Sequence, residues 1–122
     1  MPLKAMIIDD EPFARDDLRY MLAGHADIEI AWEAGKFDEA QKLLTENRPD
    51  VVFLDVQLRG GNGFDLLPAI RSAATRVIIV TAHDRYVSQA LESGAVDCLL
   101  KPVSPSRLDD ALTHLRQCIK MA

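Results

Sequence analysis

The sequence has 122 residues, a length that suits one domain with a single hydrophobic core, and its two cysteines are too few for a disulfide framework. No apolar run approaches the roughly 18 residues of a membrane span, and the N-terminus lacks the long apolar region of a signal peptide, so we expect a cytoplasmic protein without membrane contact. The formal net charge of -5 argues against direct contact with nucleic acid, because phosphate contacts need clustered Lys and Arg.

Hydrophobic patterning predicts five strands that alternate with five helices. The predicted strands are short apolar runs at residues 4–8, 28–33, 51–55, 77–81 and 96–100. The predicted helices carry apolar residues at helical spacing, at residues 12–23, 37–46, 64–70, 87–93 and 105–122. Pro12 and Pro105 suit the first turns of their helices, and Ser104 is a suitable N-cap for the last one. Gly24 and Gly94 can end the helices that precede them.

The strand at residues 51–55 is expected at the centre of the sheet, because its first four residues are apolar on both faces. Residues 28–33 alternate between apolar and other side chains, which is typical of a strand at the sheet edge. The helix that begins at Val87 places Val87, Ala90 and Leu91 in one apolar stripe. Because strands and helices alternate throughout, right-handed crossovers and a parallel sheet follow, and the predicted fold class is a doubly wound α/β fold.

Polar side chains stand where the predicted strands end. Asp9 and Asp10 follow the first strand, Asp55 ends the third, Thr81 ends the fourth, and Lys101 follows the fifth. Parallel strands point the same way, so their carboxyl ends emerge along one edge of the sheet, where doubly wound folds bind ligands. We therefore expect three carboxylates, a hydroxyl and an ammonium to form one site.

Carboxylates crowded at this edge favour a bound cation. Two of them about 4 Å apart repel by roughly 4 kcal/mol at an effective dielectric near 20. Oxygen ligands without His or Cys suit a hard ion such as Mg²⁺. With the charge offset, Asp55 can act as a nucleophile toward phosphorus, while Lys101 neutralises the incoming phosphoryl group and Thr81 donates a hydrogen bond to it. The predicted product is an aspartyl phosphate.

Several motifs make essentially the whole chain, residues 1–122, resemble the receiver domain of two-component response regulators. They are Ile7-Ile8-Asp9-Asp10-Glu11-Pro12, Asp55 with Gly63 eight residues later, Val80-Thr81-Ala82, Gly94-Ala95-Val96-Asp97 and Lys101-Pro102. Residues 10–15 together with 81–84 look most like receivers attached to LytTR-type DNA-binding domains. The resemblance implies a flavodoxin-like fold, with a five-stranded parallel sheet in the order 2-1-3-4-5 and five helices.

The resemblance also implies how the site works. A sensor histidine kinase is expected to pass a phosphoryl group to Asp55 in a Mg²⁺-dependent reaction. The ligands of the ion would be Asp55, Asp10 directly, Asp9 through water and Gln57 through its backbone carbonyl. Such a domain catalyses its own phosphorylation and dephosphorylation, and it is a signalling domain rather than a turnover enzyme.

The chain departs from the family pattern at Leu58-Arg59, where the family often has Met-Pro, and at Cys98. Cys98 stands three residues before Lys101, where the family usually has Tyr or Phe. An aromatic side chain coupled to Thr81 is therefore not expected here, and conformational coupling is expected to be weaker or to run through other packing.

Gln57 and His83 are expected to border the path of the water that limits phosphate lifetime. The peptide bond after Lys101 is expected to be cis.

Two interpretations remain for how the domain produces its output. No effector sequence follows the last predicted helix, so either a C-terminal effector domain has been removed, which we favour, or the receiver stands alone. Phosphorylation is expected to rearrange the fourth and fifth strands with their helices and to control a DNA-binding effector domain, with homodimer formation as a further expectation.

Three other functions are weighed against this one. A phosphatase of the haloacid dehalogenase type also uses an aspartyl phosphate, but residues 55–57 lack the second acid that it needs two positions after the nucleophile. A flavodoxin-like module for a nucleotide or flavin would need a Gly-rich phosphate loop after the first strand, where two acids stand instead. The third alternative is a degenerate receiver that acts only by binding other proteins, and Cys98 leaves this interpretation open.

Overall fold

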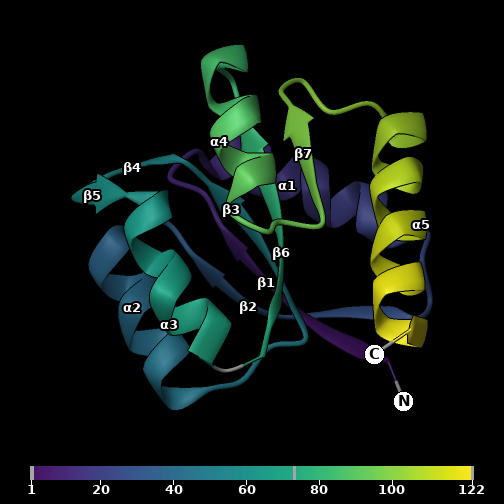
Figure 1. Ribbon diagram of the computed structural model, residues 1–122, viewed down its shortest axis with the longest axis horizontal. Coiled ribbons are helices and arrows are strands. Elements are labelled where there is room, and N and C mark those ends of the chain that lie inside the picture. The colour runs from purple at the N-terminus through teal and green to yellow at the C-terminus, as the bar shows by residue number, and fades with distance from the viewer. Residues whose placement is uncertain (1, 73, 122) are drawn as a thin grey trace.

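A five-stranded parallel sheet forms the centre of the protein (Figure 1). The computed structural model describes residues 2–72 and 74–121, so Met1 and Ala122, the ends of the predicted domain, lie outside it. The strands of the sheet are β1 (Leu3–Ile8), β2 (Ile28–Ala34), β3 (Val51–Asp55), β6 (Arg76–Thr81) and β7 (Asp97–Leu100). Their spatial order is β2-β1-β3-β6-β7, which confirms the predicted order 2-1-3-4-5 once these strands are counted along the chain.

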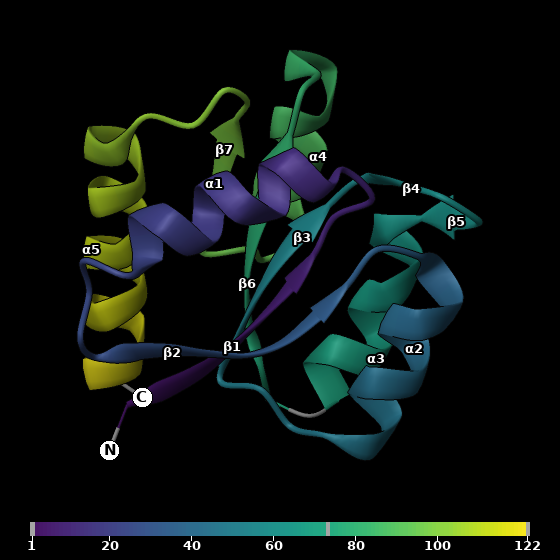
Figure 2. The same cartoon turned by 180° about the vertical axis from the view of Figure 1, so that it is seen from behind.

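Five α-helices within the described residues cover the two faces of this sheet. They are α1 (Pro12–Leu22), α2 (Phe37–Glu46), α3 (Leu67–Ser72), α4 (Val87–Glu92) and α5 (Pro105–Met121). Helices α1 and α5 lie on one face, and α2, α3 and α4 lie on the other (Figures 1 and 2). The doubly wound α/β fold is thereby confirmed. No helix in the described part of the chain has the length and hydropathy that a membrane span requires.

The first four residues of the central strand β3 are apolar, and both faces of the strand are covered. Val52 and Leu54 belong to the cluster of buried side chains under α2, α3 and α4, whereas Val51 and Phe53 belong to the cluster under α1 and α5. All four are at most 1% exposed, and burying a side chain of this size stabilises a fold by about 1.5–3 kcal/mol. Asp55 follows them at the point where the strand leaves the core.

Short elements that the sequence did not predict follow β3 and β6. They are the hairpin strands β4 (Gln57–Leu58) and β5 (Gly61–Asn62) and the 3-10 helices η1 (Gly63–Leu66) and η2 (Asp84–Tyr86). Gly60 takes a φ of 92° in the hairpin turn, a conformation that glycine adopts without strain. Asn62 Oδ1 accepts the N–H of Phe64 at 2.8 Å and starts η1. The helix predicted at residues 64–70 therefore begins with a tighter 3-10 turn before α3.

The helix ends follow most of the sequence signals. Ser104 Oγ accepts the N–H of Arg107 at 3.2 Å, as predicted for an N-cap at the start of α5. Gly94 follows α4 with a φ of 91°, which suits its predicted role at a helix end. After α1, Gly24 follows the C-cap Ala23 and donates its N–H to the Met21 carbonyl at 3.3 Å, but it does not take the left-handed φ that Gly94 takes.

The predicted apolar stripe on α4 is wrong at Leu91. Ala90 is fully buried and Val87 packs against the core, but Leu91 is 51% exposed. Leu91 lies about 100° further around the helix than Ala90, and the six-residue helix turns only a narrow face toward the sheet.

Asp97 is a buried carboxylate that joins β7 to α5. It accepts hydrogen bonds from Arg107 at 2.7 and 3.1 Å and from the N–H of Cys98 at 2.8 Å, and His114 Nδ1 lies 2.9 Å from Oδ2. Burial by itself would raise the pKa of Asp97, but the bonds to Arg107, Cys98 and His114 outweigh it and lower the pKa below its usual value. These contacts fix the last helix against the last strand.

Candidate functional site

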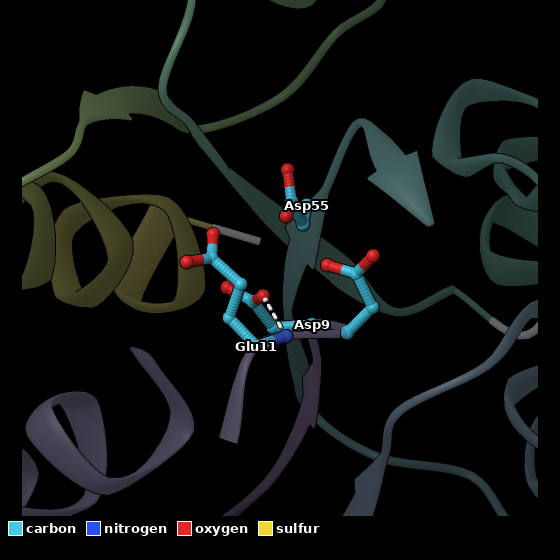
Figure 3. Close-up of side chains that lie close together, drawn as sticks. Asp9, Glu11 and Asp55 are labelled. Carbon is cyan, nitrogen blue, oxygen red and sulfur yellow. Dashed lines mark hydrogen bonds between the residues drawn. The ribbon is translucent and has the colours of Figure 1, made fainter. Parts of the chain in front are cut away.

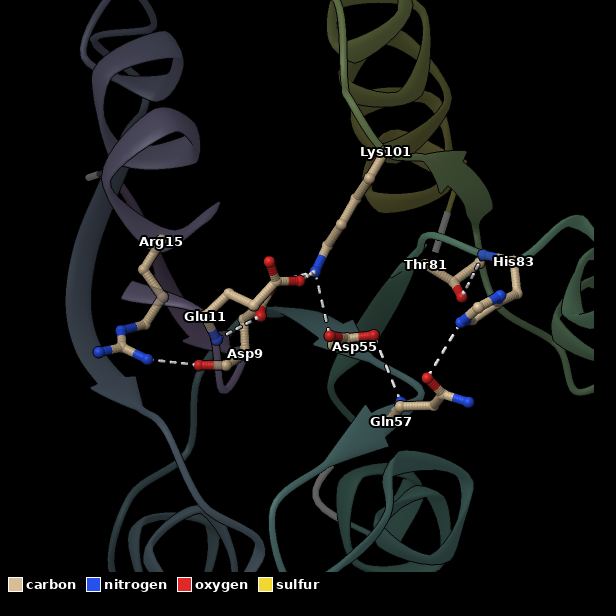
Figure 4. Close-up of polar contacts among 8 residues, drawn as sticks. All are labelled: Asp9, Glu11, Arg15, Asp55, Gln57, Thr81, His83 and Lys101. Atoms are coloured by element: carbon tan, nitrogen blue, oxygen red, sulfur yellow. Dashed lines mark hydrogen bonds and ion pairs between the residues drawn. The ribbon is translucent and has the colours of Figure 1, made fainter. Parts of the chain in front are cut away.

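The carboxyl ends of the strands bring polar side chains together at one edge of the sheet. Asp9 follows β1, Asp55 is the last residue of β3, Thr81 is the last residue of β6, and Lys101 follows β7. Figure 4 shows the four side chains at this edge, with Asp55 near the middle. Residues that are far apart in the sequence therefore share one site because the strands that carry them are parallel neighbours.

Lys101 contacts three carboxylates at once. Its Nζ lies 2.8 Å from Asp9 Oδ2, 2.9 Å from Glu11 Oε1 and 3.1 Å from Asp55 Oδ2. Burial by itself would lower the pKa of Lys101, but hydrogen bonds to Asp9 and Glu11 and the charge of Asp55 outweigh it and raise the pKa. Lys101 therefore stays protonated and gives the site a fixed positive charge.

Four acidic side chains converge beside this ammonium: Asp9, Asp10, Glu11 and Asp55. Each offers one carboxylate oxygen, and these oxygens all lie within 4.8 Å of one another. Figure 3 shows Asp9, Glu11 and Asp55 pointing into the same space, with the N–H of Glu11 bonded to Asp9 Oδ1 at 2.9 Å. Four carboxylates against one ammonium leave a surplus of negative charge, and their oxygens are the ligands that hard divalent cations prefer.

Asp55 is buried yet faces this acidic space. It is 5% exposed, and its Oδ1 accepts the N–H of Gln57 at 3.3 Å. Burial is the main reason that the pKa of Asp55 rises to about 6; the charge of Lys101 opposes the rise and the charge of Asp9 adds to it. The charged form of Asp55 is therefore disfavoured unless further positive charge lies nearby.

A cavity of about 260 Å³ opens over Asp55. Its lining residues are Asp10, Glu11, Asp55, Gln57, Ala82, His83 and Lys101. Thr81 is fully buried beside it, and the Thr81 hydroxyl accepts the N–H of His83 at 3.2 Å. The Gln57 side chain turns toward His83 rather than toward the carboxylates (Figure 4). The roles predicted for Thr81 with a phosphoryl oxygen and for the Gln57 carbonyl with a metal stay predictions.

Comparison with known proteins identifies the family. Residues 5–113 match the family described as response regulator receiver domain. The chain belongs to this family. It is 38% identical over 117 residues to the sensory transduction protein LytT of Bacillus anthracis, covering 94% of this chain and 48% of that protein. It is 40% identical over 116 residues to the transcriptional regulatory protein BtsR of Salmonella typhi, covering 94% of this chain and 48% of that protein.

Solved structures agree with this assignment. The receiver domain here resembles the response regulatory domain of mrkE from Klebsiella pneumoniae with a TM-score of 0.89 and 26% identity, over 98% of this chain and 100% of that one. It resembles the receiver domain of AraT from Geobacillus stearothermophilus with a TM-score of 0.89 and 28% identity, over 99% and 98% of the two chains. The chain spans about half the length of the curated relatives it matches. The expected similarity to receivers of LytTR-type regulators is confirmed.

Membership in this family also decides between the alternatives raised by the sequence. A receiver domain is neither a phosphatase of the haloacid dehalogenase type nor a flavin-binding module, so both of those interpretations are wrong. The predicted cis peptide bond between Lys101 and Pro102 is present. Cys98 is buried in the core cluster under α2, α3 and α4, so a small thiol takes the place of the aromatic residue that the family usually has there.

Sequence reasoning missed several residues of this receiver site. Glu11 could have been found, because it continues the run of acids after β1 and contacts Lys101. Arg15 on α1 donates to the backbone carbonyl of Asp9 at 2.5 Å and lies 3.7 Å from Glu33, which places a guanidinium behind the acidic cluster. Arg15 ends the motif at residues 10–15, but the motif did not indicate a place in the site, since its contact depends on how α1 packs against β1 and β2.

Proposed function

We propose that this receiver domain is a phosphoacceptor switch in which Asp55 accepts a phosphoryl group from a sensor histidine kinase. The observation that carries the proposal is the position of Asp55, which is buried at a strand end, lines a cavity of about 260 Å³ and lies 3.1 Å from Lys101 Nζ. A carboxylate held in this way has a fixed direction of attack and a cation beside it that neutralises phosphoryl oxygens.

The side chains of the site fit a Mg²⁺ ion. The four acidic residues supply oxygen ligands, and their charge exceeds that of Lys101. Asp9 through water, Asp10, Asp55 and the backbone carbonyl of Gln57 would hold the ion, and Glu11 is a further candidate ligand. When bound, Mg²⁺ would neutralise negative charge on the phosphoryl oxygens.

With Mg²⁺ bound, the proposed transfer uses the side chains of the site and a phosphohistidine from the kinase. A carboxylate oxygen of Asp55 attacks phosphorus, the new oxygen–phosphorus bond forms, the phosphorus–nitrogen bond breaks, and its electron pair returns to the imidazole. Lys101 stays protonated and can hold one phosphoryl oxygen. The Thr81 hydroxyl, which accepts from His83, keeps its own proton to donate to another.

The same proposal covers the partners and the output of the domain. The relatives LytT and BtsR are named as sensory transduction and transcriptional regulatory proteins, and each is about twice as long as the part this chain matches. We infer that residues 1–122 form the receiver, that the output is transcription control through a DNA-binding effector domain, and that phosphorylation promotes homodimer formation. The domain would act in the cytoplasm as a signalling domain rather than as a turnover enzyme.

Phosphorylation from a small donor tests this function directly. The protein is incubated with acetyl phosphate and MgCl₂, and its intact mass is recorded over time. We expect the mass of one phosphoryl group to be added to the wild type and not to Asp55→Asn, and the addition to fail when EDTA replaces MgCl₂. An unchanged wild-type mass, under conditions that modify a known receiver domain, would contradict the proposal.

A further inference from the structure

A row of three hydrogen-bonded side chains lies next to Asp55. Gln57 Oε1 is 3.1 Å from His83 Nε2, and Gln57 Nε2 donates to the Tyr86 hydroxyl at 3.4 Å. We call His83, Gln57 and Tyr86 the Gln57 clasp. Figure 4 shows its Gln57–His83 pair beside Asp55. The clasp joins β4 to the segment between β6 and α4, two parts of the chain that each follow a strand of the site.

The contacts define how the Gln57 amide is oriented. An amide carbonyl can only accept, so the bond to His83 requires a proton on His83 Nε2. The amide NH₂ can only donate, and the Tyr86 hydroxyl oxygen accepts from it. Without Tyr86, the exposed Gln57 side chain would keep one contact and regain much of its rotational freedom.

Tyr86 is itself held firmly by its neighbours. Its ring makes edge contacts with Phe64 and with His83, each with the ring centroids 6.1 Å apart. The guanidinium of Arg85 lies 4.9 Å from the centre of the Tyr86 ring and donates to its hydroxyl at 3.1 Å. Tyr86 thus offers Gln57 an acceptor in a fixed position.

Gln57 and His83 line the same cavity as Asp55. Tyr86 is not among the lining residues, but it contacts both Gln57 and His83. Any water that approaches a phosphoryl group on Asp55 from the cavity must pass the side chains that line it. Fixing the Gln57 amide in place therefore restricts that approach, although Tyr86 touches none of the reacting atoms.

We propose that Tyr86 is a positioning residue that holds the Gln57 amide in the lining of the cavity and lengthens the lifetime of the phosphoryl group on Asp55. This inference rests on the proposed function. In the hydrolysis, a water oxygen attacks phosphorus, the bond from phosphorus to the Asp55 oxygen breaks, and the electron pair stays on the Asp55 carboxylate. The attacking water gives up one proton to a phosphate oxygen or to the solvent, and inorganic phosphate leaves.

The variant Tyr86→Phe tests this role because it removes the hydroxyl and keeps the ring. We expect the phosphorylated domain, freed of donor, to lose its phosphoryl group about 2- to 10-fold faster than the wild type, the factor that one neutral hydrogen bond corresponds to. Tyr20→Phe is the matched control, since Tyr20 is 85% exposed on α1, and its rate should equal that of the wild type. An unchanged or slower loss in Tyr86→Phe would overturn the inference.

Two further measurements separate positioning from a general structural effect. Tyr86→Phe should accelerate the loss of the phosphoryl group when Gln57 is present, but not when Gln57 is replaced by Ala in the same protein. Equal acceleration in both cases would show that Tyr86 does not act through Gln57. In the unphosphorylated domain, the side-chain amide NMR signals of Gln57 should shift and exchange with water faster in Tyr86→Phe than in Tyr20→Phe. Identical amide signals in the two variants would overturn the clasp.

The outcomes also distinguish this inference from the proposed function. If the wild type takes up no phosphoryl group from acetyl phosphate, the proposed function fails and the effect of Tyr86 on lifetime fails with it. If the wild type is phosphorylated and Tyr86→Phe loses the group at the wild-type rate, only the inference about Tyr86 fails.

Discussion

Replacing Asp55 with Asn should make the metal-free protein more stable at neutral pH. Burial raises the pKa of Asp55 to about 6, so the fold disfavours the charged form of this side chain. In the unfolded chain the same group ionises near pH 4, as an ordinary Asp does (about 3.9). Between these values the folded protein keeps a proton that the unfolded chain releases, so the free energy of unfolding of the wild type falls as the pH rises. Asn carries no charge and avoids this loss.

The structure limits the size of the effect. A rise of the Asp55 pKa from 3.8 to about 6 corresponds to at most about 3 kcal/mol, because one pKa unit is about 1.4 kcal/mol. The cavity over Asp55 admits water, and Asn weakens the contact with Lys101 at 3.1 Å, so part of the gain is lost. Lys101 keeps Asp9 at 2.8 Å and Glu11 at 2.9 Å. We therefore expect a gain of about 1–2 kcal/mol at pH 8 and almost none at pH 4.

Urea unfolding in EDTA, followed by circular dichroism from pH 4 to pH 8, measures this difference. Asp65→Asn is the control, since Asp65 is exposed on η1 and its replacement should change the free energy of unfolding only slightly. Saturating Mg²⁺ should narrow the gap between the wild type and Asp55→Asn, because a bound cation favours the charged carboxylate. An Asp55→Asn protein that is less stable than the wild type at pH 8, or a difference that does not change with pH, would refute the reasoning.

Three further substitutions have definite expected outcomes. A Cβ at Gly63 would lie 2.1 Å from the backbone oxygen of Asp55, so Gly63→Ala should lower the free energy of unfolding by about 2 kcal/mol or more in urea and slow phosphoryl uptake measured by intact mass. A Cβ at Gly35 would lie 2.9 Å from Arg15 Nη1, so Gly35→Ala should displace that guanidinium and change the Mg²⁺ affinity measured by calorimetry. The free energy of unfolding should change by less than about 1 kcal/mol. Asp97→Asn should lower the free energy of unfolding by about 1–3 kcal/mol at pH 7, measured in urea. Because folding lowers the pKa of Asp97, the difference in stability between the wild type and this variant should shrink as the pH falls below about 4.

Local sequence patterns were sufficient for the main elements of the fold. The run at residues 51–54 is short, has no polar position and is bounded by turn residues, which indicates a strand covered on both faces, and β3 is that strand. The side chains at the strand ends could be assigned to one edge without coordinates, because parallel strands leave no choice about where their carboxyl ends lie. The pattern failed at Leu91, where a stripe at helical spacing did not show how narrow the buried face of α4 is.

The sequence by itself determined which main strands and helices form, in which order along the chain, and that Asp9, Asp55 and Lys101 meet. These properties depend on periodicity and strand direction, which neighbouring residues carry. Only the tertiary structure decided that one ammonium contacts three carboxylates, that burial raises the pKa of Asp55 to about 6, and that Gln57 donates to the Tyr86 hydroxyl beside Asp55. Distances and burial between residues remote in the chain arise from the packing of whole elements, and no local pattern encodes them.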